Sequence, residues 1–297
     1  MKSEANAQFS IQIPGKTFAV GEYVALGLGP ALVWAHDPLY RWSASAPSDL
    51  AETGDSFHPE SPAGQFAERF RCDFQKWRIK FFSPYVQRGF GSSTAEVLGY
   101  FHLRAHLNLE AVAPCGFHWW TEYREFCRGA AGPIPSGYDF LAQQGAPGWI
   151  FIHAAAQRME RWQWPFQNLA GAVLATGKKL ATHTHLRASS ETVGEDFDQC
   201  QLASLPEIWR MAKADAFCKC VNDFADQLRE RNLVAPWTAE ILSSLRAFPG
   251  VFAAKGAGAM GADAVFILYD PKRSEALADF ARLRNLTPIA SSFTVRS

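Results

Sequence analysis

The sequence predicts an α+β fold divided into two lobes, and three observations support this. Hydrophobic residues make up 48% and charged residues 20% of the 297 residues, which is enough apolar material for a sizeable core. Strand-like apolar runs dominate the first half, and helical patterns dominate the part after Leu180. The sequence also contains no internal repeat. The separation of strands into the first half and helices into the second half favours an α+β fold. We expect domains at 1–186 and 187–297.

The elements of the first half follow from the spacing of their apolar residues. Residues 9–26 contain two apolar runs separated by a tight turn at Pro14-Gly15-Lys16, and the second run is either a strand or the start of a short helix. Residues 31–45 predict a further pair of strands. The spacing predicts helices at 63–77, 94–109 and 116–130, and strands at 78–86, 148–154 and 168–176. Residues 133–144 begin as a Pro/Ser/Gly turn and enter a short helix.

The second half is expected to be mostly helical. Residues 204–246 carry three helical patterns, and residues 273–286 form an amphipathic helix. Between them, residues 250–270 predict a strand, a glycine-rich turn and a second strand.

Charge and composition exclude several classes of protein. The 29 basic and 29 acidic residues cancel, which removes the main argument for binding nucleic acid or an anionic membrane. No apolar run approaches the 18 residues of a membrane span, and the N-terminus lacks the apolar core of a secretory signal. The six cysteines form no Cys-x-x-Cys pair, so we expect reduced thiols and a cytoplasmic protein.

The stretch "YVQRGFGSSTAEVLGYF" at 85–101 places Gly89, Gly91, Ser92 and Ser93 directly before a helix. A helix start carries unpaired N–H groups and a positive dipole end, and glycine lets a phosphate approach the backbone. Serine hydroxyls can bind phosphate oxygens or magnesium. A tight turn with serine caps explains the same residues equally well. The stretch is not a Walker loop, because no Gly-Lys-Ser/Thr follows.

Three other segments carry groups suited to chemistry. "KGAGAMG" at 255–261 lies between two apolar strands; a hairpin turn needs glycine, but five small residues also favour close approach to a ligand. "PGKTFAVGEY" at 14–23 contains Lys16 and Glu22. "PSGYDFLAQ" at 135–143 presents Asp139 where a turn enters a helix.

Together with "LATGKKLATHTHL" at 174–186, these segments resemble the motifs of the GHMP small-molecule kinases, a family that includes galactokinase, homoserine kinase, mevalonate kinase and phosphomevalonate kinase. Five matches in the family's order cover almost the whole chain. The resemblance implies a mixed β-sheet N-terminal domain with helices and a helix-rich α/β sandwich C-terminal domain. It also implies transfer of the γ-phosphoryl group of ATP to an alcohol or phosphate acceptor, most similar to mevalonate or phosphomevalonate kinases.

The resemblance also assigns roles. Asp139 would take the proton of the acceptor hydroxyl, and Lys16 would keep Asp139 ionised and stabilise the transferring charge; the alternative for this pair is a structural ion pair between the lobes. The phosphate loop that would bind ATP comprises Arg88, Gly89, Phe90, Gly91, Ser92, Ser93 and Thr94. Expected substrate contacts are Lys16, Glu22, Tyr23, Ser136, Gly137, Lys179, Thr182, Gly256, Ala257 and Gly258.

Some positions depart from the family pattern. Phe90 stands where leucine is usual, and the third motif has alanine and methionine where Gly-Gly is common, similar to a phosphomevalonate-type "GAGGGD" ending at Asp263. Arg128 occupies the position of the usual magnesium-binding glutamate. Magnesium would be held by Ser92 and Ser93, with Glu122 or Glu125 as a substitute carboxylate, or with phosphate, serine and water alone.

Other features stay open. His183 and His185 could bind a metal but fit a surface or cleft role better. Lys178 and Lys179 fit either an anionic acceptor or a solvated turn. Two other functions share the motifs: a diphosphomevalonate decarboxylase-like enzyme and a non-catalytic nucleotide-binding homologue. The expected partner is a small-molecule alcohol or its phosphate, with no nucleic acid and no membrane, and a homodimer is left open.

Overall fold

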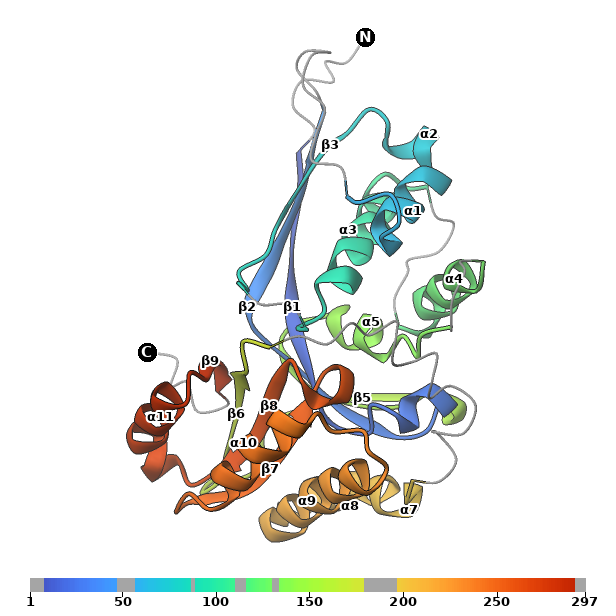
Figure 1. Cartoon of the computed structure of the whole chain (residues 1–297). Helices are drawn as coiled ribbons and strands as arrows, with labels where there is room; N and C mark the ends of the chain where they lie inside the picture. Colours follow the sequence, from blue (N-terminus) through green and yellow to red (C-terminus); the bar gives the residue numbers. More distant parts are fainter. Residues whose placement is uncertain are drawn as a thin grey trace. The chain divides into compact units, whose positions relative to one another are not determined.

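The computed structural model describes residues 8–46, 57–86, 89–109, 116–129, 134–178 and 197–291 (Figure 1). The chain forms two compact units from interleaved segments. Met1–Gly15, Pro38–Val86 and Gly91–Pro147 make the first unit, and Lys16–Asp37, Gln87–Phe90 and Gly148–Ser297 make the second. Helices and antiparallel sheets confirm the α+β class. The expected boundary near residue 187 lies outside the described residues and stays a prediction.

One sheet has five strands in the order β1-β2-β4-β5, and β3 pairs with β2 beside this path. Its strands are β1 (Gln8–Val20), β2 (Ala31–Ser45), β3 (Arg78–Phe82), β4 (Gly148–His153) and β5 (Arg158–Trp162). The helices of the first unit are α1 (Pro62–Arg69), α2 (Arg71–Phe74), α3 (Ser92–His106), α4 (Phe117–Arg128) and α5 (Tyr138–Gln143).

In the first unit, α3 packs directly on β2. A Cβ atom at Gly99 would lie 2.2 Å from Nε1 of Trp42, so only glycine allows the helix this close. The buried Phe66 of α1 packs between α3 and α4, with ring centroids 4.9 Å from Phe101 and 5.2 Å from Phe126. Aromatic packing therefore fixes the direction of α3, the helix that follows Gly91 and begins with Ser92 and Ser93.

Three of the predicted elements are wrong in detail. Residues 9–20 form one strand, not two. This strand lies at the edge of the sheet, where a residue on the open side has no neighbouring strand to bond to, so the missing N–H of Pro14 does not interrupt it. Residues 31–45 are also one strand, pairing with β4 through Ala31–Ala35 and with β3 through Arg41–Ser45. The helix expected at 63–77 breaks at Phe70, whose φ of −110° and ψ of 31° separate α1 from α2.

The second unit contains a four-stranded antiparallel sheet in the order β7-β8-β6-β9. Its strands are β6 (Ala170–Ala175), β7 (Val251–Ala257), β8 (Ala264–Tyr269) and β9 (Thr287–Ser291). The α-helices are α7 (Gln199–Ala203), α8 (Leu205–Arg210), α9 (Ala214–Glu230), α10 (Pro236–Arg246) and α11 (Ser274–Leu283). The short 3₁₀ helices are η1 (Val24–Gly27), η2 (Ala154–Ala156), η3 (Ala259–Gly261) and η4 (Pro271–Arg273).

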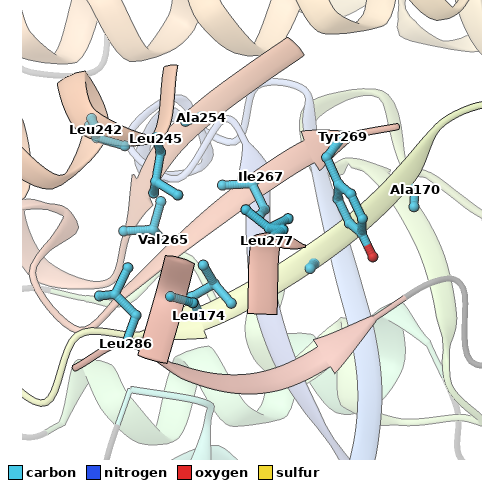
Figure 2. Packing of buried hydrophobic residues seen from close by; sticks show 12 residues of the cluster. Ala170, Leu174, Leu242, Leu245, Ala254, Val265, Ile267, Tyr269, Leu277 and Leu286 are labelled. Carbon is cyan, nitrogen blue, oxygen red and sulfur yellow. The ribbon is translucent and has the colours of Figure 1, made fainter. Parts of the chain in front are cut away.

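One face of this sheet forms a hydrophobic core with two helices. Figure 2 shows Leu242 and Leu245 of α10 gathered with Val265 and Ile267 of β8. Leu277 of α11 belongs to the same cluster. Alternate residues of β8 face this core, as the pleat of a half-buried strand requires. The core holds the β7–β8 hairpin, which carries the third motif, at a fixed place in the unit.

The helical patterns at 204–246 and 273–286 are confirmed as α8 to α11, and the strand–turn–strand at 250–270 as β7 and β8. Sequence reasoning missed α7, β5 and β9. Both missed strands are short edge strands, one rich in charged residues and the other containing Pro288. No helix among the described residues is long and apolar enough to cross a membrane.

Candidate functional site

The start of α3 lies in the first unit and lacks a side-chain cap. Gly91 is the N-cap with φ 89°, and the first helical hydrogen bond runs from Ala95 N–H to Gly91 O at 2.9 Å. Ser92 is half-buried and Ser93 is exposed. Neither hydroxyl has a hydrogen bond within the described part of the chain, so the serines are not the caps that the simpler interpretation expects. The first-turn N–H groups and two hydroxyls can therefore meet an anion.

Asp139, also in the first unit, lies in the first turn of α5. Gly137 is the N-cap with φ 71°, and a Cβ there would lie 2.7 Å from Nε1 of Trp120. The Trp120 indole N–H donates to Ser136 O at 2.8 Å, and Arg124 Nε donates to Pro135 O at 3.2 Å. Helix α4 thus holds the Pro-Ser-Gly turn that leads into Asp139.

Tyr123 of α4 is close enough to Asp139 to feel its charge. Burial raises the pKa of Tyr123 well above 10, and the negative charge of Asp139 raises it further. The phenol ring stacks on Phe140 with centroids 4.4 Å apart. Asp139 itself is half-buried, and its Oδ1 accepts the N–H of Phe140 at 3.0 Å. A neutral Tyr123 beside the carboxylate is a feature that sequence reasoning missed.

Lys16 belongs to the second unit. Its backbone N–H donates to Phe90 O at 3.0 Å, which joins β1 to the phosphate loop. The ammonium lies 5.3 Å from the centroid of the Phe18 ring. Asp139 belongs to the other unit, so a close approach of Lys16 and Asp139 stays a prediction.

Phe90 anchors the phosphate loop with a buried side chain. Its ring meets the His36 ring edge-on at 6.2 Å. Nδ1 of His36 lies 3.0 Å from Asp37 O and must donate to it, so Nε2 accepts from Thr17 Oγ1 at 3.0 Å. Burial lowers the pKa of His36 to about 4. A neutral histidine therefore supports the buried ring of Phe90.

The third motif is a hairpin packed on itself. β7 and β8 pair from Val251–Tyr269 to Ala257–Ala264. A Cβ at Gly256 would lie 2.8 Å from Cα of Gly261, so these two backbones require glycine. Met260 takes a positive φ of 50°, where the family pattern has glycine. The chain's own packing accounts for much of the glycine content that suggested a ligand.

Asp263 joins the third motif to the phosphate loop within the second unit. A Cβ at Gly258 would lie 2.3 Å from Asp263 Oδ2, and a Cβ at Gly89 would lie 2.6 Å from Asp263 Cβ. Both glycines have positive φ, 89° and 113°. Two motifs that lie far apart in the sequence thus meet on one aspartate.

Glu22 and Lys255 form an ion pair that sequence reasoning missed. Lys255 is fully buried, and its Nζ donates to Glu22 Oε1 at 2.5 Å and to Gly256 O at 2.7 Å. Burial lowers the pKa of Lys255, and the charge of Glu22 opposes that change. The expected substrate contact Glu22 therefore already holds the turn after β1 against β7.

Tyr23 is buried beside this ion pair. Its ring stacks on Phe197 with centroids 6.2 Å apart, and burial raises its pKa to about 12. Its substrate role, like that of Glu22 and Ala257, stays a prediction.

The segment after β6 lies beside the same hairpin. The Thr176 hydroxyl donates to Ala262 O, and Thr176 N–H donates to Asp263 O at 3.1 Å. Lys178 is exposed, with Nζ 5.4 Å from the centroid of the Trp237 ring. The predicted Arg88, Lys179 and Thr182, together with His183 and His185, lie outside the described residues.

No group of three or more His, Cys, Asp or Glu residues that could hold a metal ion occurs within the described ranges. Arg104 engages Glu122 at 2.6 Å, and Glu125 is exposed. The hydroxyls of Ser92 and Ser93 are oxygen ligands of a kind that magnesium accepts, and their role in holding it stays a prediction.

The fold is the two-domain α+β architecture of the GHMP small-molecule kinases. Phosphomevalonate kinase of Streptococcus pneumoniae, solved with phosphomevalonate and AMPPNP, is 15% identical with a TM-score of 0.75, covering 95% of this chain and 99% of that chain. Galactokinase of Lactococcus lactis, solved with galactose, is 10% identical with a TM-score of 0.73, covering 96% and 93%. Mevalonate kinase of L. major, solved with R-mevalonate, is 16% identical with a TM-score of 0.66, covering 95% and 94%.

These solved structures are GHMP kinases, so the resemblance drawn from the motifs is confirmed as a shared fold. No protein-family model matches the sequence, and no curated protein matches it in sequence.

Proposed function

We propose that this chain is an ATP-dependent kinase that transfers the γ-phosphoryl group to a small alcohol or phosphorylated alcohol, of the mevalonate or phosphomevalonate type. The shared fold with kinases of small molecules supports the reaction class. The observation that carries the proposal is the start of α3, where a left-handed glycine precedes two serines whose hydroxyls have no partner among the described residues.

The phosphate loop would bind the triphosphate through main-chain amides. The positive end of the helix dipole and the first-turn N–H groups at the start of α3 favour binding of an anion there. Gly89 and Gly91 supply the positive φ angles of the loop, while the buried ring of Phe90 anchors it. Phosphoryl transfer depends on positioning and charge stabilisation more than on covalent chemistry, and this loop would supply both.

Asp139 is the proposed general base and Lys16 its cationic partner. The Asp139 carboxylate, fixed at the start of α5, would accept the proton of the acceptor hydroxyl as the γ-phosphoryl group transfers. Lys16 would keep that carboxylate ionised and stabilise the charge on the transferring group. Neutral Tyr123 keeps one side of Asp139 free of competing charge.

Magnesium would be held by Ser92 or Ser93 and by the nucleotide phosphates, where it neutralises phosphate charge. The acceptor contacts remain those predicted at Lys16, Glu22, Tyr23, Ser136, Gly137, Lys179, Thr182 and at Gly256–Gly258. The cytoplasmic location and a homodimer stay predictions.

The test is an ADP-release screen with mevalonate, phosphomevalonate, homoserine and several sugars. We expect ADP release that depends on one alcohol and yields its phosphorylated product. Release of carbon dioxide with a diphosphorylated hydroxy acid would instead identify a decarboxylase. Tight ATP binding without ADP release across the panel would identify a non-catalytic homologue and overturn the proposal.

Asp139→Asn tests the assigned base. Asparagine keeps the hydrogen bond from Phe140 N–H but cannot take a proton, so kcat should fall by about 10²–10⁴-fold while AMPPNP binding stays within about three-fold. Asp270→Asn is the matched control, because Asp270 also caps a helix start, accepting Lys272 N–H at 3.0 Å. A turnover of wild-type size in Asp139→Asn would remove Asp139 from the mechanism.

A further inference from the structure

Gln143, the last residue of α5, has a buried side chain whose polar atoms all form hydrogen bonds within the first unit. It is 1% exposed. Its Nε2 donates to Pro14 O at 2.6 Å and to Gly91 O at 3.2 Å, and its Oε1 accepts from Thr94 Oγ1 at 2.5 Å. A carboxamide has two N–H donors and one oxygen acceptor, so every polar group of Gln143 is bonded.

The partners of Gln143 lie near Lys16, Ser92 and Ser93 in the sequence. Pro14 stands two residues before Lys16 in β1, while Gly91 and Thr94 flank the two serines of α3. Asp139 precedes Gln143 by four residues on α5, which places both on one face of the helix. One buried amide therefore bonds α5 to β1 and to the start of α3.

Close packing adds to these hydrogen bonds. A Cβ at Gly91 would lie 2.8 Å from both Nε2 and Oε1 of Gln143, so the carboxamide lies directly on the Gly91 Cα. Gly91 O also accepts Ala95 N–H, the first hydrogen bond of α3. The amide of Gln143 thus contacts the residue that sets where α3 begins.

We propose that Gln143 is a positioning residue for phosphoryl transfer: its amide fixes α5, and with it Asp139, against the start of α3 and against β1. This inference rests on the proposed function. Gln143 touches neither nucleotide nor acceptor in this role; it acts through Asp139 and Gly91. Displacement of a catalytic group by about 1 Å can lower a rate by about 10²-fold, so loss of the amide should act mainly on kcat.

Gln143→Met is the test variant, because methionine keeps the length and volume of the side chain but makes none of the three hydrogen bonds. Gln144→Met is its matched control. The Gln144 amide accepts Gly116 N–H at 2.6 Å and donates to Gly116 O at 3.2 Å, so this variant loses two similar hydrogen bonds next to α5 without touching Pro14, Gly91 or Thr94.

Two measurements separate positioning from simple stability. Amide hydrogen exchange of residues 91–98 should speed up by about ten-fold or more in Gln143→Met and stay at the wild-type rate in Gln144→Met. With the acceptor found in the screen, kcat should fall by about ten-fold or more in Gln143→Met, with the acceptor KM within about three-fold. Gln144→Met should keep both constants within about two-fold.

Wild-type exchange and wild-type kcat in Gln143→Met would overturn the inference, as would an equal loss of kcat in both variants. If Gln143→Met does not fold, Thr94→Val replaces it. Valine keeps the shape of threonine but removes the hydroxyl that bonds to Oε1 of Gln143 and lies 3.0 Å from Gly91 O. Unchanged exchange at 91–98 would then overturn the inference. A wild-type protein that phosphorylates no acceptor would refute the proposed function, whereas the exchange comparison would still decide whether Gln143 holds the start of α3.

Discussion

The start of α3 and the β7–β8 hairpin are similar in sequence, because both combine glycines with other small residues, but only the start of α3 also carries hydroxyl donors without a partner among the described residues. In the hairpin, Gly256 faces Gly261 and Gly258 lies on Asp263, so protein atoms occupy the space that the glycines leave. At the start of α3, Gly91 contacts Gln143, and the hydroxyls of Ser92 and Ser93 have no partner among the described residues. Glycine content alone therefore does not identify a ligand site; donors without a protein partner do.

This comparison predicts different consequences of mutation. Substitutions in the hairpin should lower the free energy of unfolding, because they disturb packing. Substitutions of the serines at α3 should lower activity and leave stability unchanged, because those side chains support no other part of the described structure.

Gly258→Ala should give the largest effect. Its φ of 89° is unfavourable for alanine, and the new Cβ would lie 2.8 Å from Asp263 Cβ, which cannot move away as a flexible chain end would. Strain and overlap together should lower the free energy of unfolding by about 3–5 kcal/mol, measured by urea denaturation.

Gly27→Ala is the control for this variant, because nothing lies within 4 Å of the added Cβ. Its free energy of unfolding should stay within about 0.5 kcal/mol of the wild type. Equal stability of Gly258→Ala and Gly27→Ala would mean that packing does not require the hairpin glycines. The contrast between the hairpin and the start of α3 would then be wrong for the hairpin.

The sequence predicted those parts of the fold that local pattern determines. The apolar spacing in 94–109 and 273–286 gave helices that the structure contains as α3 and α11. It failed for 31–45, because β2 continues through Pro38 only with different partners on its two halves, β4 and β3. Long-range pairing of this kind leaves no local signal.

The candidate site divides in the same way. Glycines, serines and Asp139 stand in short motifs and could be named from the sequence. The partners of Lys255 and Gln143 could not, because Glu22 and Pro14 lie 233 and 129 positions away in the chain. A lysine in an apolar strand pattern, as in "FAAKGA", is a signal that could have identified the buried ion pair, since a buried charge needs a partner.

Low pH should lower the free energy of unfolding through His36, which supports the buried ring of Phe90. We expect this effect to be smaller than that of Gly258→Ala. Burial lowers the pKa of His36 from 6.5 to about 4, so the unfolded chain binds a proton more readily than the folded one. The stability that neutral His36 contributes is fully present above pH 6.5 and is lost as the pH falls towards 4, a difference of about 3 kcal/mol. Urea denaturation between pH 7 and pH 4 measures it.

His36→Gln isolates this contribution, because glutamine does not titrate in that range. Its loss of stability between pH 7 and pH 4 should be smaller than that of the wild type by about 3 kcal/mol. The control variant is His58→Gln, which replaces an exposed imidazole. The same pH dependence in His36→Gln and in the wild type would contradict the assignment.

The smallest effect concerns the serines and tests the other half of the comparison. The double variant Ser92→Ala and Ser93→Ala removes two hydroxyls that bond to nothing in the described structure, so its free energy of unfolding should stay within about 0.5 kcal/mol of the wild type. If the hydroxyls bind phosphate and magnesium, kcat/KM for ATP should fall by about 10–100-fold, or about 1.4–2.7 kcal/mol of transition-state binding. Ser243→Ala, on the exposed face of α10, should change neither quantity. A double variant that loses stability but keeps kcat/KM would show that these serines serve the helix, and the start of α3 would then be a turn like the hairpin.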